Sequence, residues 1–239
     1  MICLTFDNLG EVSELERGQW PAGEPLGRHP SVTRSLPRIL ALLAEVGVRA
    51  TFFVEGLNSR LYPDTLRELG AAGHEVAYHG WRHERWADLD PAAERASLER
   101  GVEAMEALGL RPVGFRPPGG RLTAATPALL RELGFTYVSP EADAAEPHDR
   151  LAVLPFRWPL TDALYYLPHF ADLRERYLGT RGEQPPSRLR AAIAAARDEI
   201  ALFHPFLLED DERFAVLRDV LEEAREAGAV PCRELIRRA

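Results

Sequence analysis

The sequence predicts an α/β fold, a distorted (β/α)7-type barrel, formed by a single domain over residues 1–239. Short apolar segments alternate with amphipathic helical segments along the chain, as in parallel βαβ units. Seven or eight such units favour a barrel over an open sheet. Polar residues follow several predicted strand ends, where active sites of barrels lie. A chain of this length fits one barrel-sized domain or two small ones, but no linker or repeat divides it.

The predicted elements follow in order. Strands are expected at residues 2–6, 50–54, 75–78, 113–115, 137–138, 152–156, 200–203 and 229–230. Helices are expected at residues 36–46, 64–69, 91–108, 126–133, 188–197 and 213–227. Ser35 and Asp90 are predicted N-caps. Glycine is predicted to stop four helices, at Gly70, Gly109, Gly134 and Gly228. Residues 10–30 and 160–186 break the alternation, and we expect both to be long loops over the active-site face.

Composition excludes some classes of partner. The chain has 37 acidic and 29 basic residues, a formal charge of −8, which gives no reason to expect nucleic acid or an anionic membrane. Cys3 and Cys232 are expected to be buried free thiols, although a barrel would bring their segments together and make a disulfide conceivable. No signal-peptide pattern and no apolar run of about 20 residues is visible, so a cytoplasmic protein is expected.

His79 and His83 are the most informative pair. Two imidazoles four residues apart, directly after a predicted strand, can reach one divalent metal, and neutral imidazole suits zinc and similar ions. Such a pair is more often a surface accident when it stands alone. Its place at a strand end favours a metal site and therefore a hydrolase that activates water.

Three further motifs follow strand ends. They are Thr-Phe-Asp-Asn at residues 5–8, Phe-Arg-Pro-Pro-Gly-Gly at 115–120 and Leu-Phe-His-Pro at 202–205. Together with the histidine pair, Ala-Thr-Phe-Phe-Val at 50–54 and Gly-His-Glu-Val at 73–76, they resemble the polysaccharide deacetylase family, the nodulation-type deacetylase homology domain. The resemblance covers nearly the whole chain. It implies a distorted barrel and hydrolysis of non-peptide C–N bonds, usually N-acetyl groups, with a bound divalent metal.

The resemblance also assigns roles. His79 and His83 would bind the metal, and Asp7 would take a proton from the attacking water. Arg116 would hold that carboxylate ionised and oriented, and His204 would protonate the leaving nitrogen. An amide needs these parts, because its amine leaves poorly unless it is protonated.

One branch of the family acts on small amides and cyclic imides, and this chain is similar to it in two places. Leu-Pro-Phe-Arg-Trp at 154–158 is followed by Asp162, and His204 precedes proline. Substrate contacts are predicted at four residues, namely Pro118, Gly119, Trp158 and Tyr165. His169, in the expected loop at 160–186, is a further candidate for a substrate contact. Aromatic residues such as Trp158 and Tyr165 are at least as often the packing core of a loop as part of a binding surface.

Asn8 departs from the family motif, which has a metal-ligating aspartate there. Three alternatives stay open: Asn8 ligates weakly through its amide oxygen, Asp7 moves in as the ligand, or the site has lost its metal. The acid that supports His204 is also open, between Glu141, Asp143 and Asp162.

The sequence therefore predicts a metal-dependent hydrolase, an N-deacetylase or deformylase of a sugar or small amide. The metal is expected to be zinc, with nickel, cobalt or manganese as alternatives. The competing hypothesis is a non-catalytic, deacetylase-like carbohydrate-binding protein whose metal site Asn8 weakens. A small molecule or sugar is the expected partner, and the oligomeric state is open.

Overall fold

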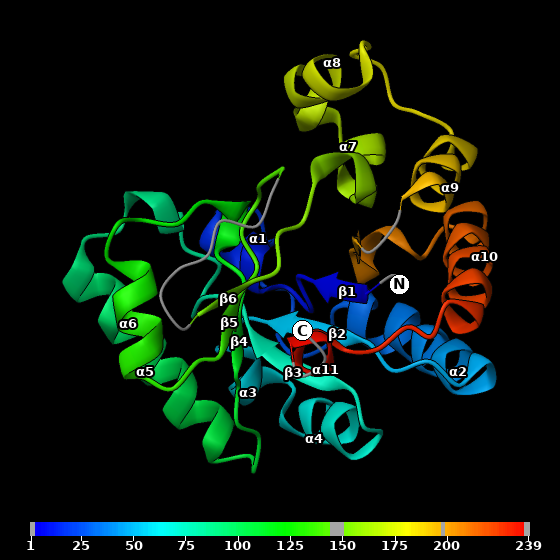
Figure 1. Ribbon diagram of the computed structural model, residues 1–239. Helices are drawn as coiled ribbons and strands as arrows, with labels where there is room; N and C mark the ends of the chain where they lie inside the picture. The colour runs from blue at the N-terminus through cyan, green and yellow to red at the C-terminus, as the bar shows by residue number, and fades with distance from the viewer. Residues whose placement is uncertain (1–2, 144–150, 197–198, 237–239) are drawn as a thin grey trace.

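The computed structural model describes residues 3–143, 151–196 and 199–236. Seven parallel strands form one curved sheet in the order β6-β5-β4-β3-β2-β1-β7 (Figure 1). Their bounds are β1 Cys3–Asp7, β2 Thr51–Val54, β3 Glu75–Tyr78, β4 Gly114–Phe115, β5 Tyr137–Val138, β6 Ala152–Val153 and β7 Ile200–Phe203. The predicted α/β class and the distorted seven-stranded barrel are confirmed.

The barrel closes weakly between its two edge strands. After β6 the chain continues to Thr161, which makes a single parallel bridge to Leu202 in β7. Because Thr161 and β1 occupy the two edges of β7, no edge is left there for another strand. The strand predicted at residues 229–230 is therefore wrong: these residues lead into a short helix instead, and Val230 is buried.

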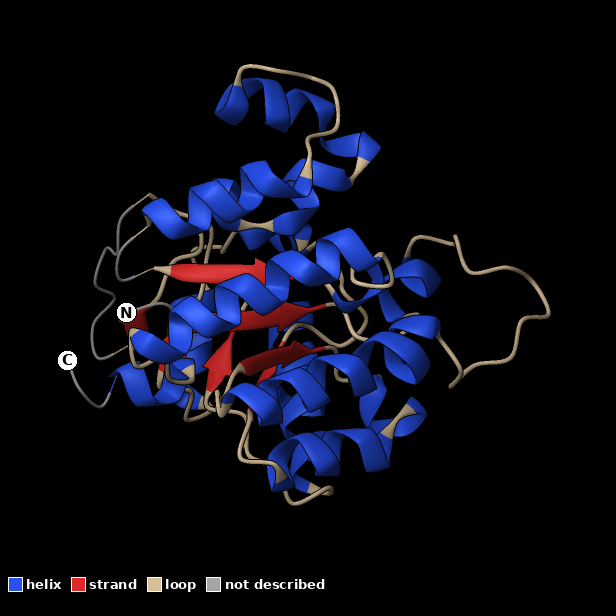
Figure 2. Cartoon of the chain, turned by 90° about the vertical axis from the view of Figure 1, so that its right-hand side faces the viewer, coloured by secondary structure: helices blue, strands red, loops and turns tan. Residues whose placement is uncertain are grey.

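The helices surround the strands, as Figures 1 and 2 show. Six correspond to predicted helices: α2 Leu36–Val46, α4 Pro63–Ala71, α5 Pro91–Glu106, α6 Thr126–Glu132, α9 Pro186–Ala195 and α10 Asp211–Glu226. Five short ones were not predicted: α1 Val12–Glu16, α3 Asn58–Leu61, α7 Asp162–Tyr166, α8 Ala171–Leu178 and α11 Cys232–Ile236. The expected loop at 160–186 thus contains α7 and α8, which stand beyond the barrel at the top of Figure 1.

Two predictions of helix ends are wrong. Ser35 is not an N-cap, because helical structure already begins at Ser31 and the Ser35 side chain makes no capping bond. Gly70 lies inside α4, where a Cβ atom would approach the Leu110 side chain to 2.6 Å, so this glycine permits close packing. Asp90 is confirmed as the cap of α5, since it accepts a hydrogen bond from the Ala93 backbone at 2.8 Å.

The side chains of the strands divide the core into two layers. Phe52 packs outward against the helices, whereas the next residue, Phe53, packs into the barrel. Cys3 and Cys232 lie in the inner layer as buried free thiols with their sulfur atoms 3.2 Å apart, which confirms that prediction. Within the described residues, no helix is long and apolar enough to cross a membrane.

Candidate active site

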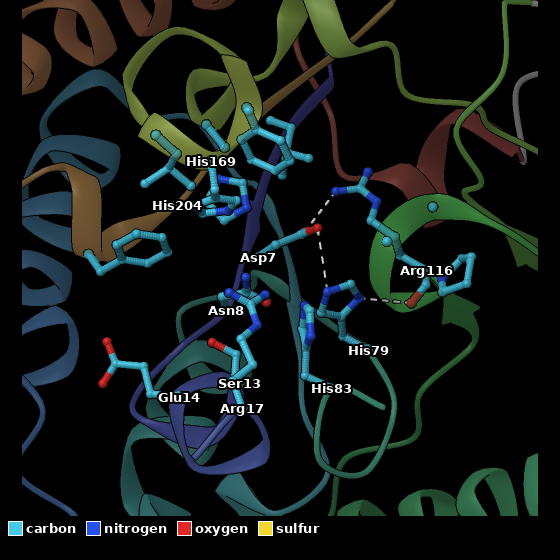
Figure 3. A pocket seen from close by; sticks show the side chains of 18 of the residues that line it. Asp7, Asn8, Ser13, Glu14, Arg17, His79, His83, Arg116, His169 and His204 are labelled. Carbon is cyan, nitrogen blue, oxygen red and sulfur yellow. Dashed lines mark hydrogen bonds and ion pairs between the residues drawn. The ribbon is translucent and has the colours of Figure 1, made fainter. Parts of the chain in front are cut away.

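Side chains from four strand ends meet in one pocket of about 820 Å³ (Figure 3). Asp7 ends β1, His79 follows β3, Arg116 follows β4 and His204 follows β7. All four line the pocket, because carboxyl ends of parallel strands open on the same side of a barrel. The predicted metal residues Asn8 and His83 line it too, so the structure brings these six predicted residues together.

Arg116 holds Asp7 in place from inside the barrel. Its guanidinium is fully buried and donates to Asp7 Oδ1 at 2.7 Å, to Thr5 at 3.0 Å and to the Ser139 hydroxyl at 2.9 Å. It also lies over the Phe53 ring at 4.0 Å. Burial nevertheless raises the pKa of Asp7, and the charge of Arg116 opposes that rise only in part. Arg116 therefore orients the Asp7 carboxylate, while burial raises the affinity of that carboxylate for a proton.

His79 is held in one tautomer. Its Nδ1 lies 2.8 Å from the Arg116 carbonyl oxygen, which can only accept, so Nδ1 carries the proton and Nε2 keeps its lone pair. Burial lowers the pKa of His79 to about 3 and lowers that of His83 as well. The two rings lie 5.1 Å apart between centroids. Both imidazoles are thus neutral near pH 7, which is the form that binds a metal.

Asn8 adopts a left-handed backbone conformation, with φ of 58°. The Asn58 amide stabilises this turn, because it donates a hydrogen bond to the carbonyl of the next residue, Leu9, at 2.7 Å. Asn8 is 8% exposed, and its Oδ1 atom is buried without a hydrogen-bond partner among the described residues. A buried acceptor without a partner is costly, and a cation is one partner that would satisfy it.

Asp7 Oδ1 is bonded to Arg116, whereas its Oδ2 lies 3.8 Å from His79 Nε2, a separation that two ligands of one metal can also have. In the described part of the chain, no three His, Cys, Asp or Glu side chains form a group that would hold a metal. Asn8, whose residue type is outside that set, supplies a further buried oxygen in the same pocket as His79 and His83.

His204 and Asp162 form a second ion pair on the other side of the pocket. Asp162 opens α7 and is fully buried; its two oxygens accept from His204 Nδ1 at 2.6 Å and from the His204 backbone N–H at 2.7 Å. Burial alone would lower the pKa of His204, but the charge of Asp162 and its hydrogen bond outweigh burial and raise it. Of the three acids left open by the sequence, the structure brings Asp162 to His204, whereas Glu141 accepts from Tyr177.

Some of the predicted substrate contacts line the pocket and others do not. Trp158, Gly119 and His169 line the pocket. Tyr165 does not: its ring is 1% exposed in the core and its hydroxyl donates to the Pro159 carbonyl at 2.9 Å, so the prediction of a contact is wrong. Pro118 lines an adjoining hollow instead.

Sequence reasoning missed three residues of the site. Ser139, which anchors Arg116, directly follows β5, so the strand-end rule that found Asp7 would also have found it. Phe156 lines the pocket after β6. Arg17 comes from the segment expected to cover the site, but one arginine among many carries no distinguishing pattern.

The comparisons with known proteins identify the family of this chain. The sequence profile of the polysaccharide deacetylase family matches residues 1–138, more than half of the chain. The chain belongs to the polysaccharide deacetylase family. The family resemblance seen in the motifs is thus confirmed, whereas its narrower part, the branch acting on small amides, stays a prediction.

Three relatives show how far the likeness extends. Chitin deacetylase 1 of Saccharomyces cerevisiae is 36% identical over 103 residues, 43% of this chain and 34% of that protein. The chain spans about a third of the length of the curated relatives it matches first. A Mycobacterium smegmatis protein, provisionally named a polysaccharide deacetylase, is 29% identical with a TM-score of 0.79, over 96% of this chain and 85% of that one. The Puue allantoinase structure, at 20% identity and a TM-score of 0.70 over 96% and 85%, shows the fold alone.

Proposed function

We propose that this protein is a metal-dependent hydrolase of non-peptide C–N bonds, an N-deacetylase or deformylase of a sugar or small amide, with residues 1–239 as its catalytic domain. One observation carries the proposal: the Asp7–Arg116 pair and the His204–Asp162 pair meet at one pocket, which the neutral His79 and His83 also line. Family membership supports an amidohydrolase, and curated relatives are named as deacetylases of chitin and peptidoglycan.

The residues present fit a divalent metal. His79 presents an unprotonated Nε2, His83 is neutral, and Asn8 adds a buried oxygen that lacks a partner. Two imidazoles and one oxygen suit zinc, with nickel, cobalt or manganese as alternatives. When bound, the metal would polarise the scissile carbonyl and make water a better nucleophile near neutral pH.

Asp7 is proposed as the base. Oδ1 is held by Arg116, which leaves Oδ2 facing the pocket to accept a proton from the attacking water. Because burial raises the pKa of Asp7, the carboxylate is more basic than an exposed aspartate, which favours proton uptake.

His204 is proposed as the acid. Asp162 fixes Nδ1 of the ring, so Nε2 is the atom that carries the transferable proton. The raised pKa keeps His204 protonated closer to neutral pH, and its proton would go to the departing nitrogen. Leu167, Phe170 and Trp158 form an apolar wall beside it, where an acyl group or sugar face would pack.

A metal and activity measurement tests the proposal. Purified protein should contain near-stoichiometric metal and should release acetate or formate, or open a cyclic imide, in a chelator-sensitive reaction. His79→Gln should lose metal and turnover together. His74→Gln is the matched control, because His74 precedes the same strand at its other end, is also buried, and only accepts from the Ala50 backbone. Retention of metal by His79→Gln would contradict the ligand assignment.

The non-catalytic alternative rests on Asn8, since a neutral amide binds a transition metal more weakly than a carboxylate. Asn8→Asp separates the two functions. A decayed enzyme should gain metal and turnover with this substitution. A wild-type protein that already turns over N-acetyl or formyl substrates would exclude the alternative. A cytoplasmic location and a small-amide substrate stay predictions, to be checked by fractionation and by the same assay.

A further inference from the structure

Arg17 is a charged residue of the pocket that the proposed chemistry does not use. It follows α1 and lines the pocket, and in Figure 3 its side chain extends from α1 into the pocket toward Asn8. Its charge contributes, after burial, to the lowered pKa of His169, which lines the same pocket. Arg17 therefore lies within electrostatic reach of the pocket's interior.

The carboxylates around Arg17 are engaged elsewhere. Glu16 forms an ion pair with another arginine at 2.9 Å, Glu14 lies 3.6 Å from a histidine nitrogen, and Asp7 is bonded to Arg116. Over residues 3–143, 151–196 and 199–236, Arg17 itself has no ion pair or side-chain hydrogen bond. Its guanidinium therefore has no direct partner of opposite charge in the described part of the chain.

The arginines and acids that line the pocket leave one net positive charge. Arg17, Arg85 and Arg116 lie there with Asp7 and Glu14, so three positive charges face two negative ones. A bound divalent ion would add to this surplus. Concave sites of one sign concentrate ligands of the opposite sign, and the planar guanidinium matches carboxylate and phosphate groups with two parallel hydrogen bonds.

Arg17 also stands where two hollows meet. It lines an adjoining hollow of about 540 Å³ together with Trp86, Gly119 and Arg121, and both hollows share His83. Arg121 is another arginine without an ion pair in the described part of the chain. A substrate whose amide lies beside His79 can therefore extend past Arg17 into this second space, which three arginines and three acids line.

We propose that Arg17 recognises an anionic group, a carboxylate or a phosphate, on the substrate, so that the preferred substrate is a negatively charged N-acyl compound. This inference rests on the proposed hydrolase function for the position of the amide. Arg17 acts as a specificity residue and takes no part in proton transfer.

Calorimetric titration tests this with three related sugars: neutral N-acetylglucosamine, its 6-phosphate, and N-acetylmuramic acid, which carries a carboxylate. Wild-type protein should bind at least one anion about 10-fold more tightly than the neutral sugar, since a charged hydrogen bond contributes that much or more. Arg17→Ala should abolish the difference, and Arg17→Lys should keep part of it. Arg225→Ala is the control, because Arg225 is an exposed arginine on the outer helix α10. Which of the two anionic sugars binds more tightly shows whether Arg17 prefers a phosphate or a carboxylate.

Equal affinity for all three sugars in the wild type would overturn the proposal. So would an unchanged preference for the anions in Arg17→Ala, or an equal loss for neutral and anionic sugars. Turnover is scored separately. An anion preference that depends on Arg17 in a protein without hydrolytic activity would refute the hydrolase and leave the recognition role standing.

Discussion

Asp162→Asn should remove the acid function of His204 while leaving the metal site intact. In the wild type, both oxygens of Asp162 are used by His204, at 2.6 Å for Nδ1 and 2.7 Å for the backbone N–H. Asparagine keeps the shape and one acceptor but removes the charge. General acid catalysis contributes about 10²- to 10⁴-fold, so we expect kcat to fall by about that factor with metal content unchanged.

The pH dependence gives the sharper test. Burial lowers the pKa of His204, but Asp162 and, to a smaller extent, Asp7 together raise it above the ordinary value. Activity that needs protonated His204 is therefore lost as pH rises through this raised pKa. In Asp162→Asn only the charge of Asp7 still opposes burial, so the alkaline limb of kcat/KM should move to lower pH.

The free energy of unfolding should depend on pH in the same direction as activity does. The raised pKa of His204 means that its pairing with Asp162 stabilises the fold fully below the unfolded pKa of about 6.5 and less as pH rises through the folded pKa. Removing one partner of a buried pair costs about 3–5 kcal/mol, so the Tm deficit should be larger at acid pH than at alkaline pH. The control is Asp172→Asn, an exposed acid on α8. An unshifted alkaline limb in Asp162→Asn would refute the assignment of His204 as the acid.

Three further predictions concern the supports of the site. Arg116→Met should abolish turnover and cost about 3–5 kcal/mol in urea unfolding, because it leaves a buried carboxylate without its partner. Gly114→Ala should lower Tm strongly, since its Cβ would lie 1.9 Å from the Tyr137 ring, whereas Gly182→Ala, with nothing within 4 Å, should not. Asn58→Ala removes the hydrogen bond to the Leu9 carbonyl, next to the proposed ligand Asn8, and should weaken metal binding by about 10-fold in a competition assay, because residues that hold metal ligands in place change affinity by that order. Unchanged metal affinity would contradict this supporting role of Asn58.

The strand ends were the predictable part of the molecule. Buried strands are apolar runs whose ends are marked by the first polar residue, so Asp7, His79 and His204 stand out in the sequence. Parallel topology then brings those ends together without further information. Helix α2 was predicted to the residue, because its apolar periodicity ends at Gly47, which adopts φ of 75°.

Other features depend on contacts between distant segments. The apolar residues at 229–230 have strand composition, but both edges of β7 are already occupied, by β1 and by Thr161. Tyr165 is aromatic and lies in the segment over the site, yet the folding of α7 turns its ring into the core. Asp162 was one of three equivalent acids in the sequence, and only the bridge that aligns Thr161 with β7 places it against His204.

Backbone conformation finally explains why an asparagine fits at residue 8. Asn8 and His83 are the two non-glycine residues with positive φ in the described ranges, and both lie at the proposed metal site. Such strain costs about 1–3 kcal/mol for each residue and persists where function requires it. Asparagine tolerates the left-handed conformation well and still presents an oxygen. Asn8 therefore presents an oxygen to the proposed metal site without the charge of a carboxylate, and we expect a negative substrate to balance the positive charge of Arg17.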